Sequence, residues 1–271
     1  PRLLSSAASD VYKRQVQLNN NVIGSLPVNP NTFNYGVTGK GYEVTSDREI
    51  YVSIRVKHNF HAGAIVSKGV NGLGKRFRVG AMERTGANND MGFFSIVSVA
   101  DNNQISFTAD SNLVALNGLN LPNDLILDNG ESFVATFIDE NITRFIGTLI
   151  ESSENIVVNT GTLYGSFSNE IIDNVELSAN DRTDYFTGGD MGIDQLVSLD
   201  PSSDAKEYIL VRGDSFTSIE NALIIADSDN TQITINGVPY VDPETNIDTL
   251  NAGEHFFVEG NYYSEGGELQ Y

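Results

Sequence analysis

The stretch VADNNQISF, residues 99–107, combines an apolar strand end, a polar turn and a second strand that begins Ile-x-apolar. Three other stretches have the same order: VTSDREIYV (44–52), IESSENIVV (150–158) and SDNTQITI (228–235). A turn former precedes an isoleucine by three positions in each, and such residues favour turns because they hydrogen-bond to their own backbone. We therefore expect four copies of one hairpin, with the isoleucines buried. The turn formers are Asp47, Asn102, Ser153 and Asn230, and the isoleucines are Ile50, Ile105, Ile156 and Ile233.

A second pattern recurs at a similar spacing. GKRFRV (74–79), GESFVA (130–135), AKEYIL (205–210) and GEHFFV (253–258) each place an aromatic residue at the start of a strand after a turn. With the short apolar pieces ahead of them, the unit has four short strands in roughly 50 residues, which is typical of a propeller blade. We predict an all-β fold of repeated four-stranded units, β-propeller-like, with tandem β-sandwiches as the alternative. The aromatic residues are Phe77, Phe133, Tyr208 and Phe256.

The first fifteen residues, PRLLSSAASDVYKRQ, do not share this pattern and are basic where the rest is acidic. They resemble a translated library adapter, so we interpret residues 1–15 as a sequencing scar that is not native. Residues 16–271 are then one β-repeat domain, which we expect to be incomplete at both ends. An acidic insertion at about residues 165–190 interrupts the repeat.

Composition excludes several classes of function. With 36 acidic and 16 basic residues the chain has a net charge of −20, which repels nucleic acid. Cysteine is absent, so disulfides and thiolate metal sites are impossible, and no apolar run is long enough to insert into a membrane. No nucleophile elbow, phosphate loop or dinucleotide fingerprint occurs, and we expect no cofactor.

The insertion and the residues that follow it supply the candidate ligand-binding residues. Insertions in repeat folds usually form loops on one face, often the binding face. The alternative interpretation is a solvated acidic loop, and the sequence favours it. The candidates are Asp181, Asp184, Asp190, Asp194 and Gln195.

Two groups invite a metal interpretation. Asp227, Asp229 and Asn230 present oxygen atoms at the spacing of a calcium loop, but they lack the glycine and the distant glutamate of an EF-hand. His58 and His61 lie in a loop that leaves a strand, with no acidic partner at a set spacing. The turn interpretation is favoured for the first group and the absence of a metal for both.

Several longer stretches resemble the IgGFc-binding protein amino-terminal domain family over roughly residues 35–265. They are KGYEVTSDREIYVSIRV, GKRFRVGAM, GIDQLVSLDP, KEYILVRG, IADSDNTQITING and TLNAGEHFFV. The resemblance implies a large secreted or cell-surface protein, which in bacteria often carries a sorting domain for type IX secretion, and it does not imply a catalytic centre. The lack of cysteine departs from the animal members and places the chain with the bacterial ones.

Two functions follow from these observations. The first is a non-catalytic, adhesin-like interaction module of a secreted or cell-surface bacterial protein, which binds an extracellular glycan or protein or acts as a spacer. The alternative is a carbohydrate-active enzyme on a propeller, with Asp181, Asp184 or Asp190 as general acid and base. Carboxylates that converge with aromatic side chains in a funnel would favour the enzyme.

Overall fold

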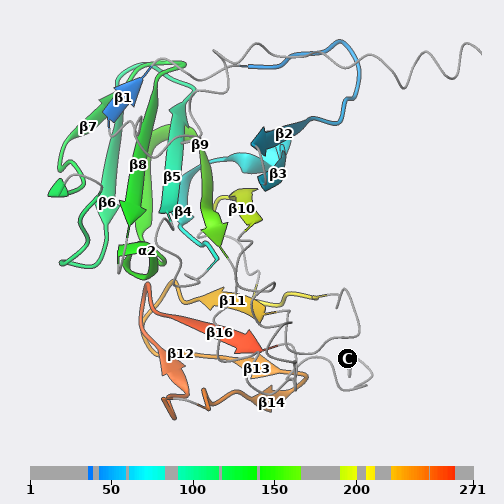
Figure 1. Ribbon diagram of the computed structural model, residues 1–271, viewed down its shortest axis with the longest axis vertical. Coiled ribbons are helices and arrows are strands. Elements are labelled where there is room, and N and C mark those ends of the chain that lie inside the picture. The colour runs from blue at the N-terminus through cyan, green and yellow to red at the C-terminus, as the bar shows by residue number, and fades with distance from the viewer. Residues whose placement is uncertain are drawn as a thin grey trace, which may run out of the picture.

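The computed structural model shows an all-β chain with almost no helix, as the sequence predicts (Figure 1). Residues 1–15 and 166–189 lie outside the part that it describes, so the predictions of a scar and of an acidic insertion stay predictions. No described helix is long and apolar enough to cross a membrane. The described residues are 36–38, 43–58, 61–82, 91–115, 118–138, 141–165, 190–199, 206–210, 221–243 and 245–259.

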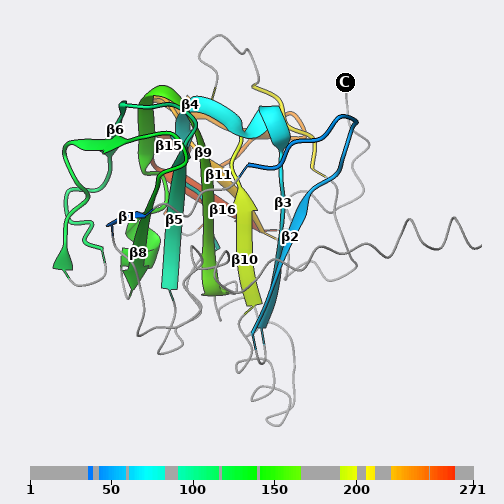
Figure 2. The same cartoon turned by 90° about the horizontal axis from the view of Figure 1, so that it is seen from above.

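The main sheet has eight antiparallel strands in the order β1-β8-β5-β9-β6-β7, with β4 and β10 also paired to β9. Figure 2 shows β8, β5, β9 and β10 side by side. The strands are β1 (Gly36–Thr38), β4 (Leu73–Arg78), β5 (Met91–Ser98), β6 (Asn103–Thr108), β7 (Leu125–Leu127), β8 (Ser132–Ile138), β9 (Leu149–Gly165) and β10 (Asp190–Gln195).

β9 is the spine of this sheet. β4 pairs with it on both sides of residues 152–155, so β4 occupies one edge, and β5 and β6 both lie along the opposite edge. β5 and β6 are therefore two halves of one long partner of β9, interrupted at residues 99–102. β7 and β8 are likewise two halves of one long strand, which is interrupted at residues 128–131. The β7 half pairs with β6 and the β8 half pairs with β5. Three neighbouring strands thus bend at the same level.

The bend folds the sheet onto itself. Phe94 on β5 and Phe107 on β6 are thirteen residues apart, which in a straight strand is about 43 Å. Their ring centroids are only 5.7 Å apart, and both rings contact Phe133 on β8. The inner faces of the two halves therefore share one apolar core, as in sheets whose strands turn a corner. Phe77, Ile105, Ile150 and Ile156 are buried in the same core.

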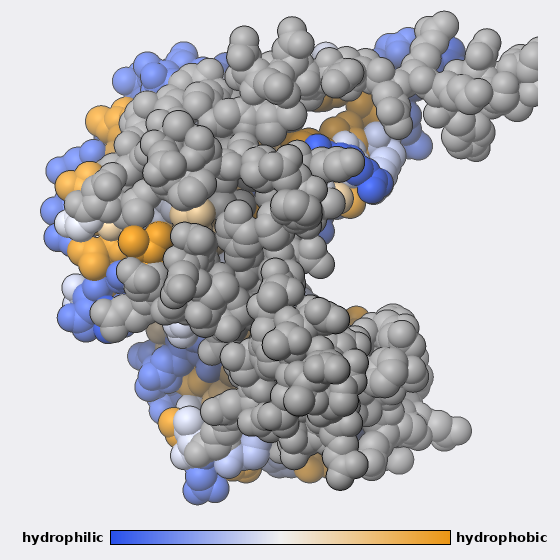
Figure 3. Space-filling view, in the orientation of Figure 1, coloured by the Kyte–Doolittle hydropathy of each residue, from blue (hydrophilic) through white to orange (hydrophobic). Residues whose placement is uncertain are grey.

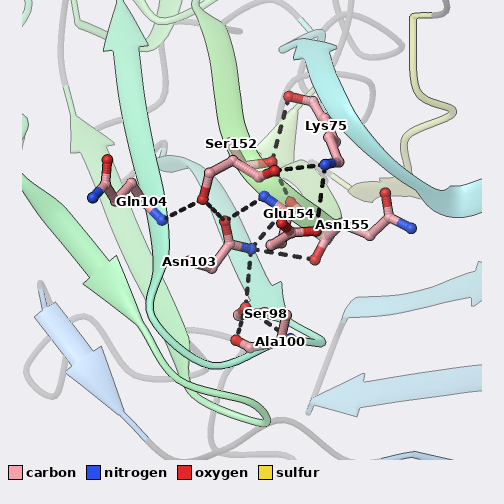
Figure 4. A network of polar contacts seen from close by, with 9 residues as sticks. Lys75, Ser98, Ala100, Asn103, Gln104, Ser152, Glu154 and Asn155 are labelled. Atoms are coloured by element: carbon pink, nitrogen blue, oxygen red, sulfur yellow. Dashed lines mark hydrogen bonds and ion pairs between the residues drawn. The ribbon is translucent and has the colours of Figure 1, made fainter.

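Asn103 holds the corner together (Figure 4). Its side chain is fully buried. The Nδ2 group donates to Ser98 Oγ at 3.0 Å and to the carbonyl oxygens of Glu154 and Asn155, and Oδ1 accepts from the amide nitrogen of Glu154 at 2.9 Å. Ser153 Oγ also donates to Oδ1 at 3.1 Å. One amide side chain thus satisfies the backbone groups that the bend removes from the ladder.

The C-terminal strands form three two-stranded ribbons: β11 with β16, β12 with β15 and β13 with β14. On β11, Leu223 and Ile225 pack against the main core, whereas Ala222 and Ile224 pack against a second, smaller core. The β11–β16 ribbon therefore lies between two cores. The strands are β11 (Asn221–Ile225), β12 (Thr231–Gln232), β13 (Thr234–Ile235), β14 (Val238–Pro239), β15 (Thr249–Leu250) and β16 (His255–Glu259).

The C-terminal ribbons turn through the same polar corner as the main sheet. β5/β6 and β7/β8 bend at 99–102 and 128–131, and β11/β12 and β15/β16 bend at 227–230 and 251–254. Four hydrogen bonds of the first corner each have a counterpart in the second. For the backbone, Gly130 N to Ser98 O matches Gly253 N to Ala226 O, and Ser98 N to Glu131 O matches Ala226 N to Glu254 O. For the side chains, Asp128 N to Glu131 Oε2 matches Asn251 N to Glu254 Oε2, and Asn129 N to Asp101 Oδ1 matches Ala252 N to Asp229 Oδ1.

Several positions predicted from the repeats are confirmed. Asn102 and Asn230 have φ angles of 53° and 58°, the left-handed conformation that asparagine tolerates in turns. Ile105 and Ile156 are buried, and Ile233 is half-buried. The aromatic residues Phe77, Phe133 and Phe256 are buried in strands.

The predictions for Ser153, Ile50 and Tyr208 are wrong. Ser153 lies within β9, because residues 152–155 bulge from a strand that β4 keeps continuous on both sides. Ile50 is 55% exposed and Tyr208 is 75% exposed, since neither lies in a described strand that would pair and bury it. The described residues do not show a propeller, tandem sandwiches or repeated four-stranded blades, because β9 pairs with β4, β5, β6 and β10 in one sheet.

The remaining elements flank the main sheet. The β2–β3 hairpin lies beside β10 (Figure 2). The short helix α2 carries the chain from β8 to β9 and is followed by Phe145, whose ring stacks on Phe137 of β8 with centroids 4.9 Å apart. These elements are β2 (Ser53–His58), β3 (His61–Val66), the 3-10 turn η1 (Gly69–Gly72) and α2 (Asn141–Arg144).

We expect Asn103→Ala to lower the free energy of unfolding by about 2–3 kcal/mol, because it removes a buried side chain together with its hydrogen bonds to Ser98 and to the backbone of residues 154 and 155. Gln104→Ala, on the exposed side of the same strand, should change it by less than about 0.5 kcal/mol. Urea denaturation of both variants checks this. Equal effects at the two positions would show that the corner does not depend on the amide.

Candidate functional site

Two arginines of β4 join the main sheet to the C-terminal strands. Arg76 Nη1 donates to Asp227 Oδ2, and Arg78 Nε donates to Asp227 Oδ1 at 2.9 Å. Arg78 Nη1 also donates to the carbonyl oxygen of Gly147 at 2.9 Å, and Arg76 Nε lies 3.4 Å from Glu151 Oε1. One carboxylate is thus shared by two guanidinium groups across the junction.

The pKa of Asp227 reflects this arrangement. Partial burial alone would raise the pKa, but the hydrogen bonds and charges of Arg76 and Arg78 outweigh burial and lower it below its ordinary value. The same hydrogen bond to Asp227 raises the pKa of Arg76. Both shifts favour the charged pair.

The junction is also close-packed at the backbone. Gly147 has a φ angle of 85° and lies against Gly253, where φ is 89°. A Cβ atom at Gly147 would collide with the carbonyl oxygen of Gly253. Only glycine combines this conformation with this approach, so the two segments fit together at a fixed distance.

A pocket of about 460 Å³ opens beside this junction. It lies between the corner 251–254 and the segments 108–110 and 143–148 of the main sheet. Its polar lining includes Arg78, Asp110, Arg144, Glu254 and His255. Arg78 is already neutralised by Asp227, and the other charges comprise one cation and two carboxylates, so the pocket does not select an anion.

The pocket does not have the features expected of a glycosidase funnel. Among the described residues, its lining contains no Phe or Tyr side chain on which a sugar could stack. Burial lowers the pKa of His255, an effect that the charge of Glu254 opposes, so the imidazole is neutral near pH 7. His255 packs edge-on against Phe257 on β16, which agrees with its interpretation as a strand residue.

The predicted ligand-binding residues are brought together only in part. Asp181 and Asp184 lie outside the described residues, and Asp190 is placed by its backbone alone, opposite Gly165. Asp194 is exposed and lies 3.3 Å from Lys68 Nζ. Asp190 and Asp194 are thus at opposite ends of β10.

Gln195 has a structural role. Its Oε1 accepts from the amide nitrogen of Lys68 at 2.6 Å, and its Nε2 donates to Asn159 Oδ1 at 3.4 Å. A Cβ atom at Gly72 would lie 2.9 Å from the same Oε1. Gln195 therefore anchors the turn η1 to β9 and β10.

The weak metal candidates have other partners. Asp227 binds the two arginines, and Asp229 Oδ1 accepts from the amide nitrogen of Ala252 at 3.0 Å. Asn230 provides the left-handed turn residue. His58 and His61 face each other across the β2–β3 hairpin, and their side chains lie outside the described part. Among the described residues no cluster of three or more metal-ligating side chains occurs.

Sequence reasoning missed the two arginines. In GKRFRV, the repeat pattern identifies Phe77 as the aromatic residue of the strand. Arg76 and Arg78 alternate with it and share the opposite face of β4. Two arginines on one face of a strand in a strongly acidic chain were the available signal. Their partner could not be read, because Asp227 is about 150 positions away.

A sequence model of the family described as IgGFc binding protein matches residues 63–267, more than half of the chain. The match begins within β3 and includes β4 to β16, and so covers both corners and the junction. No curated protein and no solved structure matches the chain.

We expect Asp227→Asn to lower the free energy of unfolding by about 1 kcal/mol at pH 7, a value reduced because the carboxylate is 35% exposed. The folded pKa lies below the unfolded one, so the stabilisation is complete above about pH 4 and is lost as pH falls through the folded pKa. The difference from the parent chain should therefore shrink in acid. Denaturation at several pH values checks this.

Asp229→Asn is the matched control, because an amide oxygen can still accept from Ala252 and no arginine contacts this residue. It should change the free energy of unfolding by less than about 0.5 kcal/mol at pH 7. A loss at Asp227 that does not shrink in acid, or an equal loss at Asp229, would contradict the assigned ion pairs of Arg76 and Arg78 with Asp227.

Calcium should act on this chain only by screening its negative charge, because Asp227 and Asp229 already have partners. In about 0.15 M salt, low millimolar calcium and magnesium should leave the thermal midpoint equally unchanged. Thermal scans with each ion check this. A calcium-selective increase that Asp229→Ala abolishes would identify a metal site.

Proposed function

The chain belongs to the IgGFc binding protein family, and from that premise we propose that it is a non-catalytic protein-binding module of a secreted or cell-surface bacterial protein. The family match over residues 63–267 is the observation that carries the proposal. In its finer form the module is adhesin-like and binds an extracellular protein or its glycans.

The scaffold supports such a role. Two apolar cores, two polar corners and the arginine clamp hold the described strands in fixed positions. On the outside, apolar patches are interspersed with hydrophilic ones along the left edge of the view (Figure 3). Pre-organised surfaces of mixed polarity suit protein ligands, because little order is lost on binding.

The proposed ligand contacts are on the acidic segment and its flanks. Gly165 at the end of β9 and Asp190 at the start of β10 are opposite each other, so the segment between them is anchored at both ends in the main sheet. Asp181 and Asp184 lie within this segment, and Asp194 lies further along β10. Carboxylates at such a position favour a ligand with a basic surface, through complementary charge.

Binding to immobilised IgG Fc, to Fab fragments and to mucin glycans tests the proposal, with Fc first because the family description names it. We expect saturable binding to one protein ligand, which the double variant Asp181→Asn, Asp184→Asn weakens about tenfold or more. Asp229→Asn should bind like the parent chain, because this carboxylate bonds within a corner.

Two outcomes would contradict the proposal. One is the absence of binding to every immobilised protein at micromolar concentrations. The other is the hydrolysis of fluorogenic glycosides, abolished by Asp181→Asn or Asp184→Asn, which would favour a carbohydrate-active enzyme.

A further inference from the structure

The pocket beside the junction contains a buried hydroxyl group without a described partner. Thr148, which directly precedes β9, is 2% exposed, and its Oγ1 atom makes no hydrogen bond within the described part of the chain. Both backbone groups of Thr148 are used, since its N–H donates to Phe145 O at 3.2 Å and its carbonyl oxygen accepts from Val79 N at 2.9 Å. The side chain is therefore the part of Thr148 that lines the pocket. Buried polar groups are rarely left without a partner, and a ligand in the pocket would satisfy this hydroxyl.

Two further groups of low exposure share this lining. The Arg78 side chain is 10% exposed, and its Nε and Nη1 atoms donate to Asp227 and to the carbonyl oxygen of Gly147. Its Nη2 atom takes part in none of the hydrogen bonds between described residues, so it can donate to a ligand. The half-buried imidazole of His255, which is neutral because burial lowers its pKa, adds one donor and one acceptor. Since Asp227 balances Arg78, these groups together suit an uncharged polar ligand.

The uncompensated charge of the pocket is on its exposed residues. Asp110 Oδ1 accepts from the amide nitrogen of Asn112 at 2.7 Å, and Glu254 Oε2 accepts from that of Asn251 at 2.6 Å. Both carboxylates are exposed, and the second oxygen of each can still accept. Arg144 also lines the pocket but already has a partner. The mouth of the pocket therefore favours a cationic group over an anionic one, through complementary charge.

We propose that this pocket binds one sugar residue through its hydroxyl groups. The volume of about 460 Å³ lies within the range of about 300–1,000 Å³ that is typical of small-molecule sites. A sugar hydroxyl both donates and accepts, so neighbouring hydroxyls can bond to Thr148 Oγ1, Arg78 Nη2 and the His255 imidazole. The carboxylates at the mouth favour an amino sugar. Because the described lining offers no Phe or Tyr for stacking, recognition depends on hydrogen bonds, and we expect millimolar affinity.

This inference deepens the proposed function, because the choice of a sugar rests on a secreted or cell-surface protein that meets glycans. The pocket and the acidic segment between Gly165 and Asp190 have no residue in common. Free sugars therefore report on the pocket, and the Fc experiment reports on the acidic segment. Binding of Fc without binding of any sugar would overturn the pocket alone. Binding of sugars without binding of any immobilised protein would overturn the proposed function alone.

Titration of glucosamine, glucose and glucuronate into the full-length chain, followed by NMR chemical shifts, tests the ligand class. The three sugars share a ring and are cationic, neutral and anionic at pH 7. We expect the signals of Thr148 and His255 to shift, and the dissociation constant to rise at least about threefold from each sugar to the next in this order. No shift with any of the three, shifts confined to other residues, or tightest binding of glucuronate would overturn the proposal.

Thr148→Val tests whether the buried hydroxyl contacts the ligand. Valine has nearly the same shape but cannot hydrogen-bond, so the change should weaken glucosamine binding at least about tenfold. In the free chain the hydroxyl has no described partner to lose, so the thermal midpoint should not fall. A lower midpoint, which would show that the hydroxyl is already bonded, or unchanged binding would overturn the proposal.

Thr136→Val is the matched control for the hydroxyl. Thr136 on β8 is 1% exposed, and its Oγ1 atom likewise has no described partner, but it does not line the pocket. This variant should bind glucosamine like the parent chain. Equal weakening by the two variants would show that a buried hydroxyl acts through the fold and not through the pocket, against the proposal.

Glu254→Gln tests the preference for an amino sugar. The amide oxygen can still accept from Asn251 while the charge is lost, so glucosamine should bind at least about threefold more weakly and glucose as before. Glu131→Gln is the control, because Glu131 has the same place in the first corner, where its Oε2 accepts from Asp128 N at 2.8 Å, and it does not line the pocket. Equal losses in the two variants, or an equal loss for both sugars, would overturn the assigned role of the mouth.

Discussion

The polar corner is the constraint on which the rest of the structure depends. Three neighbouring strands bend at one level, and the bend takes backbone groups out of the ladder. Asn103 compensates with donors and an acceptor on one buried side chain. Because the bend is satisfied in this way, a single sheet can close around Phe94, Phe107 and Phe133.

The second constraint is the junction between the two cores. β11 presents one face to each core, since Leu223 and Ile224 point in opposite directions. Apolar contact alone would leave the ribbon free to slide, because dispersion and burial are not directional. The clamp of Arg76 and Arg78 on Asp227 is directional and fixes the register of the two parts.

The charges at the junction contribute to the stability of the fold. The carboxylate of Asp227 is shared by Arg76 and Arg78, so it is not available to a ligand. Gly165 and Asp190, which flank the acidic segment, pair with each other at the ends of β9 and β10 and are not part of this network. A scaffold held in this way agrees with membership of a family of binding proteins.

The sequence by itself determined the all-β class, the turns at Asn102 and Asn230 and the burial of Ile105, because turn chemistry and alternation are local properties. Only the tertiary structure decided that Ser153 lies inside a long strand, since an identical polar signal forms a turn or a bulge according to which strand lies beside it. The partner of Arg78 was equally beyond the sequence, because charge pairing across a junction leaves no local pattern and depends on which surfaces the folded sheet brings together.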